Sequence, residues 1–227
     1  MIRFLSRRVL VSCGAALCIP LILGGCSQQQ GTREGSSITS LLAGAGRSIG
    51  AARAYDRATR RLGEAMSAND TGYILADAAR NKRELSLGAV LTGQALDSCE
   101  EALRDMSRPE LKKQMPHFQF GCANVRDSVA WALYRQQRYK EALLQQEQAI
   151  AETSAVAALM GTARQSEVNR TKAELRYHLG EIYRALDRRE EARQQFQMAL
   201  KVVPRHSGVV AGLRALEREP LSGRQRR

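Results

Sequence analysis

The chain has 227 residues, of which 44% are hydrophobic, and a formal charge of +12. This length allows one ordinary domain or one short helical array, and it leaves no room for an added catalytic domain of lysozyme type. A large positive charge attracts polyanions. Part of the charge is also explained by solvated helix faces, which is the commoner origin of such a surplus.

The N-terminus reads as an export signal. It opens with three arginines, Arg3, Arg7 and Arg8. The apolar run 9–23 follows, which is too short to cross a bilayer, and it leads through the small residues 24–25 to Cys26. Residues 23–26, Leu-Gly-Gly-Cys, resemble the lipobox of bacterial lipoproteins, in which the cysteine carries acyl chains and becomes the new N-terminus. The alternative is an ordinary secretory signal with Cys26 near the cut by chance.

The resemblance implies where the mature protein is held. Acyl chains on Cys26 would anchor it firmly, because each buried methylene contributes about 0.8 kcal/mol. Ser27 follows the cysteine where an aspartate would favour the inner membrane, so we expect an outer-membrane lipoprotein facing the periplasm. The mature chain would keep a charge of about +9, and its polyanionic partners there would be anionic lipid or acidic protein surfaces. Nucleic acid is not an expected partner.

Two cysteines remain in the mature chain, because Cys13 and Cys18 leave with the signal and Cys26 is lipidated. In an oxidising compartment we expect a disulfide between Cys99 and Cys122, worth about 3 kcal/mol on the chain-entropy model. The alternative is two buried free thiols.

Nearly everything after residue 37 reads as helix, so the predicted fold class is all-α. Residues 26–37 form a lipidated polar tether, and 38–122 form an N-terminal helical region. In that region we expect helices over 40–68, ending at Asn69-Asp70, and over 71–106. Ser107 and Pro109 suit the start of a short turn that ends before Pro116. A loop with His117, Phe118 and Phe120 would then lead to Cys122.

Two later segments resemble each other and the tetratricopeptide repeat, a helix-turn-helix unit of about 34 residues. The clearer copy spans 173–206 and has seven signature residues in place: Leu179, Gly180, Tyr183, Ala192, Phe196, Ala199 and Pro204. It departs from the pattern at Arg176, where tryptophan is usual, and at Asp187, where glycine is usual. The weaker copy begins near Ala123 and carries Val129, Ala130, Leu133, Tyr139, Ala142 and Ala149.

The two copies lie 50 residues apart, so about 16 extra residues near 157–172 extend a helix or form a loop. Residues 207–218 read as a capping helix, which completes a repeat region over 123–218, and 219–227 form a basic tail. Two units and a cap are fewer than the three stacked units that such arrays need. We therefore expect the helices of 38–106 to complete a right-handed α–α superhelix.

No catalytic or cofactor site is apparent in the sequence. His117, His178 and His206 have no metal-ligand spacing, and Cys99 and Cys122 form no CxxC pair. Glycines in 44–50 suggest a dinucleotide loop only superficially, because no strand precedes them, and close helix packing explains them better. We expect no enzyme activity, no cofactor and no metal.

The repeat resemblance implies a partner-binding groove lined by positions 2, 5, 9 and 12 of each first helix. These residues are Asn124, Asp127, Trp131 and Tyr134 in the first unit, and Glu174, Tyr177, Glu181 and Arg184 in the second. Trp131 and Tyr134 share one helical face and would anchor a peptide or a partner helix. The alternative places Trp131 in the core against the 85–106 helix. The paired Lys/Asn pattern that clamps a C-terminal carboxylate is missing.

The sequence therefore predicts a non-catalytic adaptor that docks an envelope protein, such as a pilus or secretion-system component. One alternative is a scaffold of peptidoglycan enzymes. Another, of a different class, is a cell-wall hydrolase or thiol oxidoreductase with an unrecognised site.

Overall fold

A computed structural model describes residues 37–218, and all of its elements are helical. The predicted signal peptide, Cys26, most of the tether and the basic tail lie outside the described residues. Residues from Leu41 onward belong to one compact unit, which holds all but the first turn of the helices described. The helices are α1 (Ser37–Asp77), α2 (Lys82–Met106), α3 (Met115–Arg135), α4 (Tyr139–Ala157), α5 (Gln165–Ala185), α6 (Arg189–Val202) and α7 (Ser207–Arg218), with short 3-10 turns at Pro109–Leu111 and Thr162–Arg164.

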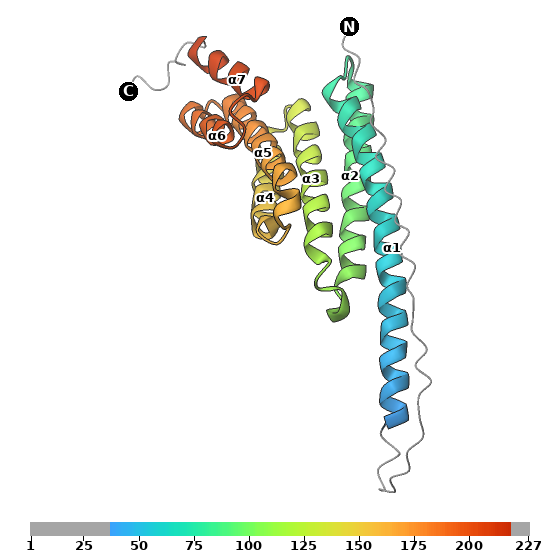
Figure 1. Cartoon of the computed structure of the whole chain (residues 1–227). Helices are drawn as coiled ribbons and strands as arrows, with labels where there is room; N and C mark the ends of the chain where they lie inside the picture. The colour runs from blue at the N-terminus through green and yellow to red at the C-terminus, as the bar shows by residue number, and fades with distance from the viewer. Residues whose placement is uncertain (1–36, 219–227) are drawn as a thin grey trace, which may run out of the picture. The chain divides into compact units, whose positions relative to one another are not determined.

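From α2 onward, each helix packs mainly against its neighbours in the chain, as Figure 1 shows for the array as a whole. The pairs α3–α4 and α5–α6 are the two predicted repeats. Both turns contain a residue with positive φ at the same place, Gln137 at 63° and Asp187 at 60°. The all-α repeat array expected from the sequence is confirmed.

The second repeat is held together by a ring that fills the space left by two glycines. Phe196 is fully buried between α5, α6 and α7. A Cβ on Gly180 would lie 2.3 Å from Phe196 Cε1, and one on Gly212 would lie 2.6 Å from Phe196 Cζ. The glycine in α5 is therefore needed for close packing, as the signature predicts. Residues 207–218 form the expected capping helix, α7.

The N-terminal helices differ from their predicted boundaries. Asn69 and Asp70 lie inside α1, which continues to Asp77, so the expected helix end at 69–70 is wrong. The break falls at 78–81, where the Asn81 side chain accepts a hydrogen bond from the Glu84 N–H at 2.9 Å. Glu84 in turn accepts from the Arg80 N–H at 2.8 Å. This reciprocal cap begins α2.

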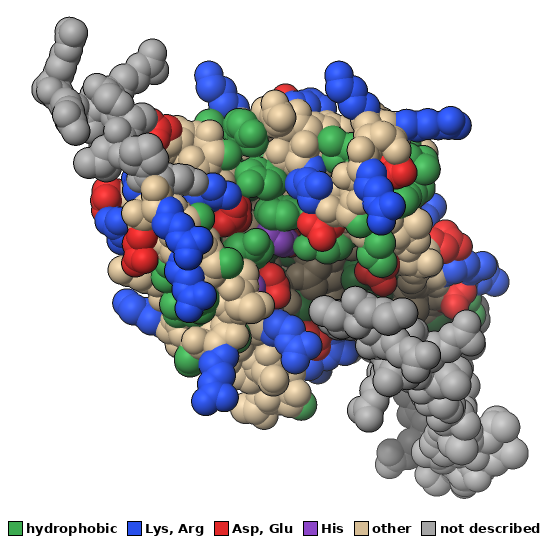
Figure 2. Space-filling view, turned by 90° about the horizontal axis from the view of Figure 1, so that it is seen from above, with side chains coloured by type: hydrophobic (Ala, Val, Ile, Leu, Met, Phe, Trp, Pro, Cys, Tyr) green, Lys and Arg blue, Asp and Glu red, His purple; other side chains and the backbone are tan. Residues whose placement is uncertain are grey.

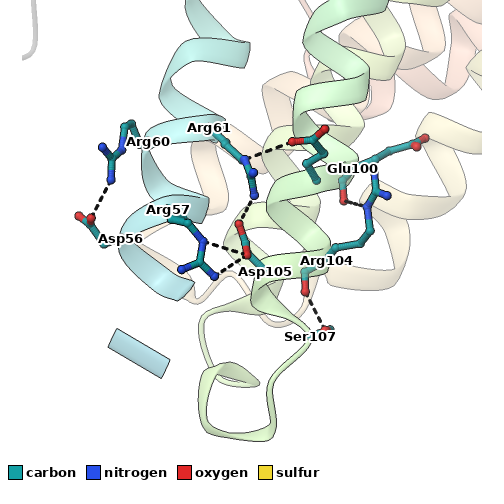
Figure 3. Close-up of polar contacts among 9 residues, drawn as sticks. Asp56, Arg57, Arg60, Arg61, Glu100, Arg104, Asp105 and Ser107 are labelled. Carbon is teal, nitrogen blue, oxygen red and sulfur yellow. Dashed lines mark hydrogen bonds and ion pairs between the residues drawn. The ribbon is translucent and has the colours of Figure 1, made fainter. Parts of the chain in front are cut away.

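The contact between α1 and α2 depends on small residues at one end and charges at the other. A Cβ on Gly88 would lie 2.6 Å from the backbone N of Ala76, so the two helices touch there. At the far end, Arg57 Nη2 lies 2.9 Å from Asp105 Oδ1 and Arg61 pairs with the same carboxylate (Figure 3). Burial would raise the pKa of Asp105, but these two guanidinium groups lower it.

The connection into the first repeat is also more helical than expected. Ser107 does not cap the following turn: it ends α2, and its hydroxyl donates to the Arg104 carbonyl at 2.7 Å. Pro109 does begin a short turn, but α3 starts at Met115, so the predicted loop through Phe118 and Phe120 is helix. Proline is tolerated in the first turn of a helix, where its missing N–H is no loss.

The extra residues between the repeats both form a loop and extend a helix, the two possibilities that the sequence left open. The chain leaves α4 after Ala157, turns through 158–164 and enters α5 at Gln165, so α5 begins well before the second signature. The glycines of 46–50 lie within α1 rather than in a phosphate-binding loop. A Cβ on Gly50 would lie 3.1 Å from Arg108 Nη1.

Candidate functional site

Three helices, α1, α3 and α5, share a surface that we call the inner face, and all eight predicted groove residues lie on α3 and α5. Contacts across this face join the two repeats to each other and to the end of α1. The resemblance placed these residues on one side of the array, and the structure brings most of them together. Unlike the free groove that the resemblance implies, the structure shows several of these side chains already bonded to neighbouring residues.

Asp127 is the buried centre of the inner face. Its carboxylate oxygens lie 2.8 and 3.0 Å from His178 Nδ1 on α5. Gln146 on α4 donates to Asp127 Oδ1 at 2.6 Å and to the Leu175 carbonyl at 2.9 Å. His178 is 3% exposed, so this network is largely buried, and it ties α3, α4 and α5 together. Asp127 therefore has a structural role, because its carboxylate joins three helices.

The surroundings of His178 favour the charged form of its imidazole. Burial alone would lower the pKa of His178, but the charge and hydrogen bond of Asp127, helped by Glu174 and Asp77, raise it. Paired in this way, a buried imidazolium and carboxylate compensate each other's loss of solvation.

Trp131 is buried like a core residue, but its ring contacts other residues of the inner face. It is 6% exposed, so it does not stand free as a peptide anchor. Its ring stacks on that of His178, with centroids 4.3 Å apart, and on that of Tyr134, with centroids 4.8 Å apart. Its indole N–H donates to Asp77 Oδ1 at 2.9 Å. Trp131 therefore shapes the floor of the inner face.

Asp77 ends α1 and fixes it to the first repeat. Asp77 binds Arg135 as well as Trp131: the Arg135 guanidinium donates to both the backbone carbonyl and the carboxylate of Asp77. This contact explains why α1 runs past residue 70: its last turn is needed to close the inner face.

The remaining groove residues of the second repeat form a polar edge. Arg184 Nη2 lies 2.6 Å from Glu181 Oε2, and the Tyr134 hydroxyl donates to the same oxygen at 3.5 Å. Tyr177 packs beside Trp131, with ring centroids 6.2 Å apart. Burial, with the nearby Glu181, raises the pKa of Tyr177 to about 12, so its phenol stays neutral.

A cavity of about 510 Å³ opens between α1, α3 and α5. Its lining includes the predicted residues Asn124, Asp127 and Glu174, together with His178. The other lining residues are Met66, Asn69, Asp70, Tyr73, Ile74, Ser128, Arg170 and Thr171. Figure 2 shows one hollowed face of the molecule, where hydrophobic, acidic and histidine side chains gather and Lys and Arg surround them.

Asn69 gives this cavity an unused hydrogen-bond acceptor. Its side chain is 6% exposed, and its Oδ1 has no hydrogen-bond partner among the described residues. Tyr73 lies beside it, 6.2 Å from His178 between ring centroids. Burial and the surrounding carboxylates, Asp77 first, raise the pKa of Tyr73, so it remains a neutral donor. A buried amide oxygen without a partner is costly unless a ligand supplies a donor.

Sequence reasoning missed four of these residues: Asn69, Tyr73, Gln146 and His178. His178 was taken as an isolated histidine because Asp127 lies 51 positions away in the chain. Asn69 was taken as a helix end. Only the register of the two repeats, which sets α5 beside α3, could have paired His178 with Asp127.

Cys99 and Cys122 are adjacent and buried as free thiols. Cys122 Sγ donates to the Cys99 carbonyl at 3.5 Å, and both side chains belong to one apolar cluster. The neighbouring Cys99 and burial together raise the pKa of Cys122, so this thiol is not a reactive thiolate. The disulfide expected between the two cysteines stays a prediction.

Two negative findings apply to residues 37–218. No helix there combines the length and apolar character needed to cross a bilayer. No three His, Cys, Asp or Glu side chains of that part of the chain gather as metal ligands would.

Comparison with known families agrees with this geometry. Residues 122–156 match the family model described as "Tetratricopeptide repeat". The match covers most of α3 and nearly all of α4, the copy whose signature is the weaker of the two. No curated protein and no solved structure matches the chain significantly.

The fold and the match define a class: a helical-repeat protein with a tetratricopeptide repeat at its centre. Repeats of this kind serve protein–protein interaction and are typically non-catalytic. The sequence-based resemblance is confirmed for this unit, and the identical turn geometry of α5–α6 extends the same architecture to the second copy.

Proposed function

We propose that this chain is a lipid-anchored, non-catalytic adaptor whose inner-face cavity binds a segment of a partner protein in the bacterial envelope. The observation that carries the proposal is the cavity of about 510 Å³, which is lined by residues that the repeat pattern predicts as groove positions. Pockets of this size suit one or two side chains of a docked segment.

The lining indicates what such a segment must offer. The lining supplies hydrogen-bond acceptors, because Asn69 Oδ1 has no partner among the described residues and the carboxylates of Asp70 and Glu174 also line the cavity. Arg170 is the one Lys or Arg side chain in the lining. A partner segment that presents N–H donors, such as a lysine or arginine side chain, complements this surface in both hydrogen bonding and charge.

The place of action follows from the lipobox resemblance at Cys26 and the polar tether after it. We propose an outer-membrane site facing the periplasm, with a pilus or secretion-system component as the partner. The tether would let the repeat array reach a partner a few nanometres from the membrane.

Site-specific photo-crosslinking in cells tests the proposal. A photoreactive amino acid at position 124, in the cavity lining, should crosslink one envelope protein that mass spectrometry identifies. The same amino acid at Gln148, which is exposed on α4 away from the cavity, is the matched control and should give no such product.

A blocking variant makes the test specific. With the photoreactive group placed at Arg170, Asn124→Trp should fill the cavity and abolish the crosslink, while circular dichroism shows an unchanged helical fold. Equal crosslinking from positions 124 and 148, or a product that survives Asn124→Trp, would exclude the cavity as the docking site.

A further inference from the structure

A second cavity lies between α4, α5 and α6 and differs in charge from the inner-face cavity. Its volume is about 330 Å³. Three of its lining residues are cationic, Lys172, Arg176 and Lys201, and no acidic residue lines it. Three positive charges at one cavity without a carboxylate in its lining make this a cationic site.

Arg176 is the key side chain of this cavity. It occupies the repeat position where tryptophan is usual, so a charge replaces an apolar ring. The guanidinium donates to Gln195 Oε1 at 2.8 Å and lies 3.4 Å from Met198 Sδ, and both partners are uncharged. Burial lowers the pKa of Arg176, and no carboxylate of residues 37–218 counters that effect. A half-buried, uncompensated cation favours an anion beside it.

Thr153 supplies an independent observation. It lines the same cavity, its side chain is 1% exposed, and its hydroxyl has no hydrogen-bond partner among the described residues. A helical threonine ordinarily satisfies this hydroxyl with a backbone carbonyl of the preceding turn. Here the hydroxyl has no partner, and its residue lines the same cavity as the three cations.

We propose that this cavity binds a phosphate group, held by Lys172, Arg176 and Lys201 with the Thr153 hydroxyl as a further donor. Donors from three helices surround the space, which suits a tetrahedral anion better than a planar carboxylate. Leu175 forms part of the apolar wall, beside which the organic part of a phosphodiester can pack. The phosphate can come from a free anion or from a lipid headgroup.

Thermal unfolding of the full chain tests the site and separates the two sources. Inorganic phosphate, compared with chloride at equal ionic strength, should raise Tm by about 3–6 °C at ten times its Kd. Dihexanoyl phosphatidylglycerol, kept below its micelle concentration, represents the headgroup source. A lower Kd for this lipid than for inorganic phosphate assigns the site to headgroups, and the reverse order assigns it to free phosphate.

Charge-matched variants make the result specific. Lys172→Met with Lys201→Met should abolish the response, whereas Lys112→Met with Lys113→Met, which removes the same charge from an exposed turn, should keep it. Arg176→Leu should lose the response and unfold at a higher Tm than wild type without anion, because an uncompensated charge is removed.

The proposal is overturned if neither probe shifts Tm, or if the two double variants respond alike. It is also overturned if an acidic peptide stabilises the chain and phosphate does not. Should Arg176→Leu fail to fold, the two lysine double variants still decide the question. The site is independent of partner binding at the inner face, so either can fail alone.

Discussion

A single carboxylate, that of Asp127, meets the imidazole of His178 and the amide of Gln146 at a largely buried point between three helices. The raised pKa of His178 means that the folded state holds a proton that the unfolded chain would release near its ordinary pKa. The pair therefore stabilises the fold fully below that ordinary pKa. Its contribution is lost as pH rises through the pKa of the folded state.

We expect the free energy of unfolding to fall as pH rises above the ordinary histidine pKa of 6.5, because the pKa of His178 is raised in the folded state. Denaturant unfolding followed by circular dichroism at a series of pH values measures this slope. Asp127→Asn should flatten it, because the partner that holds the proton is gone. His117→Gln, which changes an exposed histidine, should keep it. A slope that survives Asp127→Asn would assign the pH dependence to other groups.

At the scale of elements, the close contact of α1 with α2 depends on two glycines, Gly72 on α1 and Gly88 on α2. In Gly88→Ala the new methyl carbon would meet the backbone of Ala76, and the helices must separate. We expect a loss of about 1–3 kcal/mol in the free energy of unfolding, the usual cost of overpacking.

Gly93→Ala on the same helix is the control for Gly88→Ala. A Cβ at Gly93 meets nothing within 4 Å, so the better helix propensity of alanine should raise stability by about 0.5–1 kcal/mol. Urea unfolding compares the two variants. Equal effects at both positions would contradict the close approach of α1 and α2.

The elements also show what the sequence could predict. Helix pairs with strong signatures, such as α5–α6 and the cap α7, follow from local pattern because their packing residues are close in the chain. The boundary between α1 and α2 does not. Asn69 and Asp70 read as a helix end, but contacts of Asp77 with Trp131 and Arg135 favour continuing the helix. Local propensity is a weak guide where tertiary contacts oppose it.

The candidate site was also predictable only in part. The groove positions Asn124, Asp127 and Glu174 were predictable, because repeat register fixes which side of a helix they occupy. The contact between Asp127 and His178 was not predictable, because the two side chains meet only through packing of α3 on α5. The cavity's third wall, with Asn69, comes from helices that match no family pattern.

At the scale of the whole molecule, we propose that lipid on Cys26 decides where the repeat array is held. We expect Cys26→Ser to move the protein from the membrane fraction to the soluble envelope fraction, since one acylated residue supplies the proposed anchor. Cell fractionation and immunoblotting measure the shift. The released protein should keep its helical circular dichroism and its crosslink from position 124.

Cys13→Ser is the control, because this cysteine lies in the predicted signal and should leave the distribution unchanged. Membrane retention of Cys26→Ser would mean that another segment holds the chain to the envelope.

The last turn of α1 has a consequence for how the binding face can be transplanted. Asn69 and Tyr73 wall the cavity, and Asp77 fixes the Trp131 ring beneath it, although all three precede the first repeat. A graft of residues 115–218 onto another scaffold would carry every repeat signature and yet lose one wall of the pocket. The portable module is therefore larger than the repeats themselves, and it begins with α1.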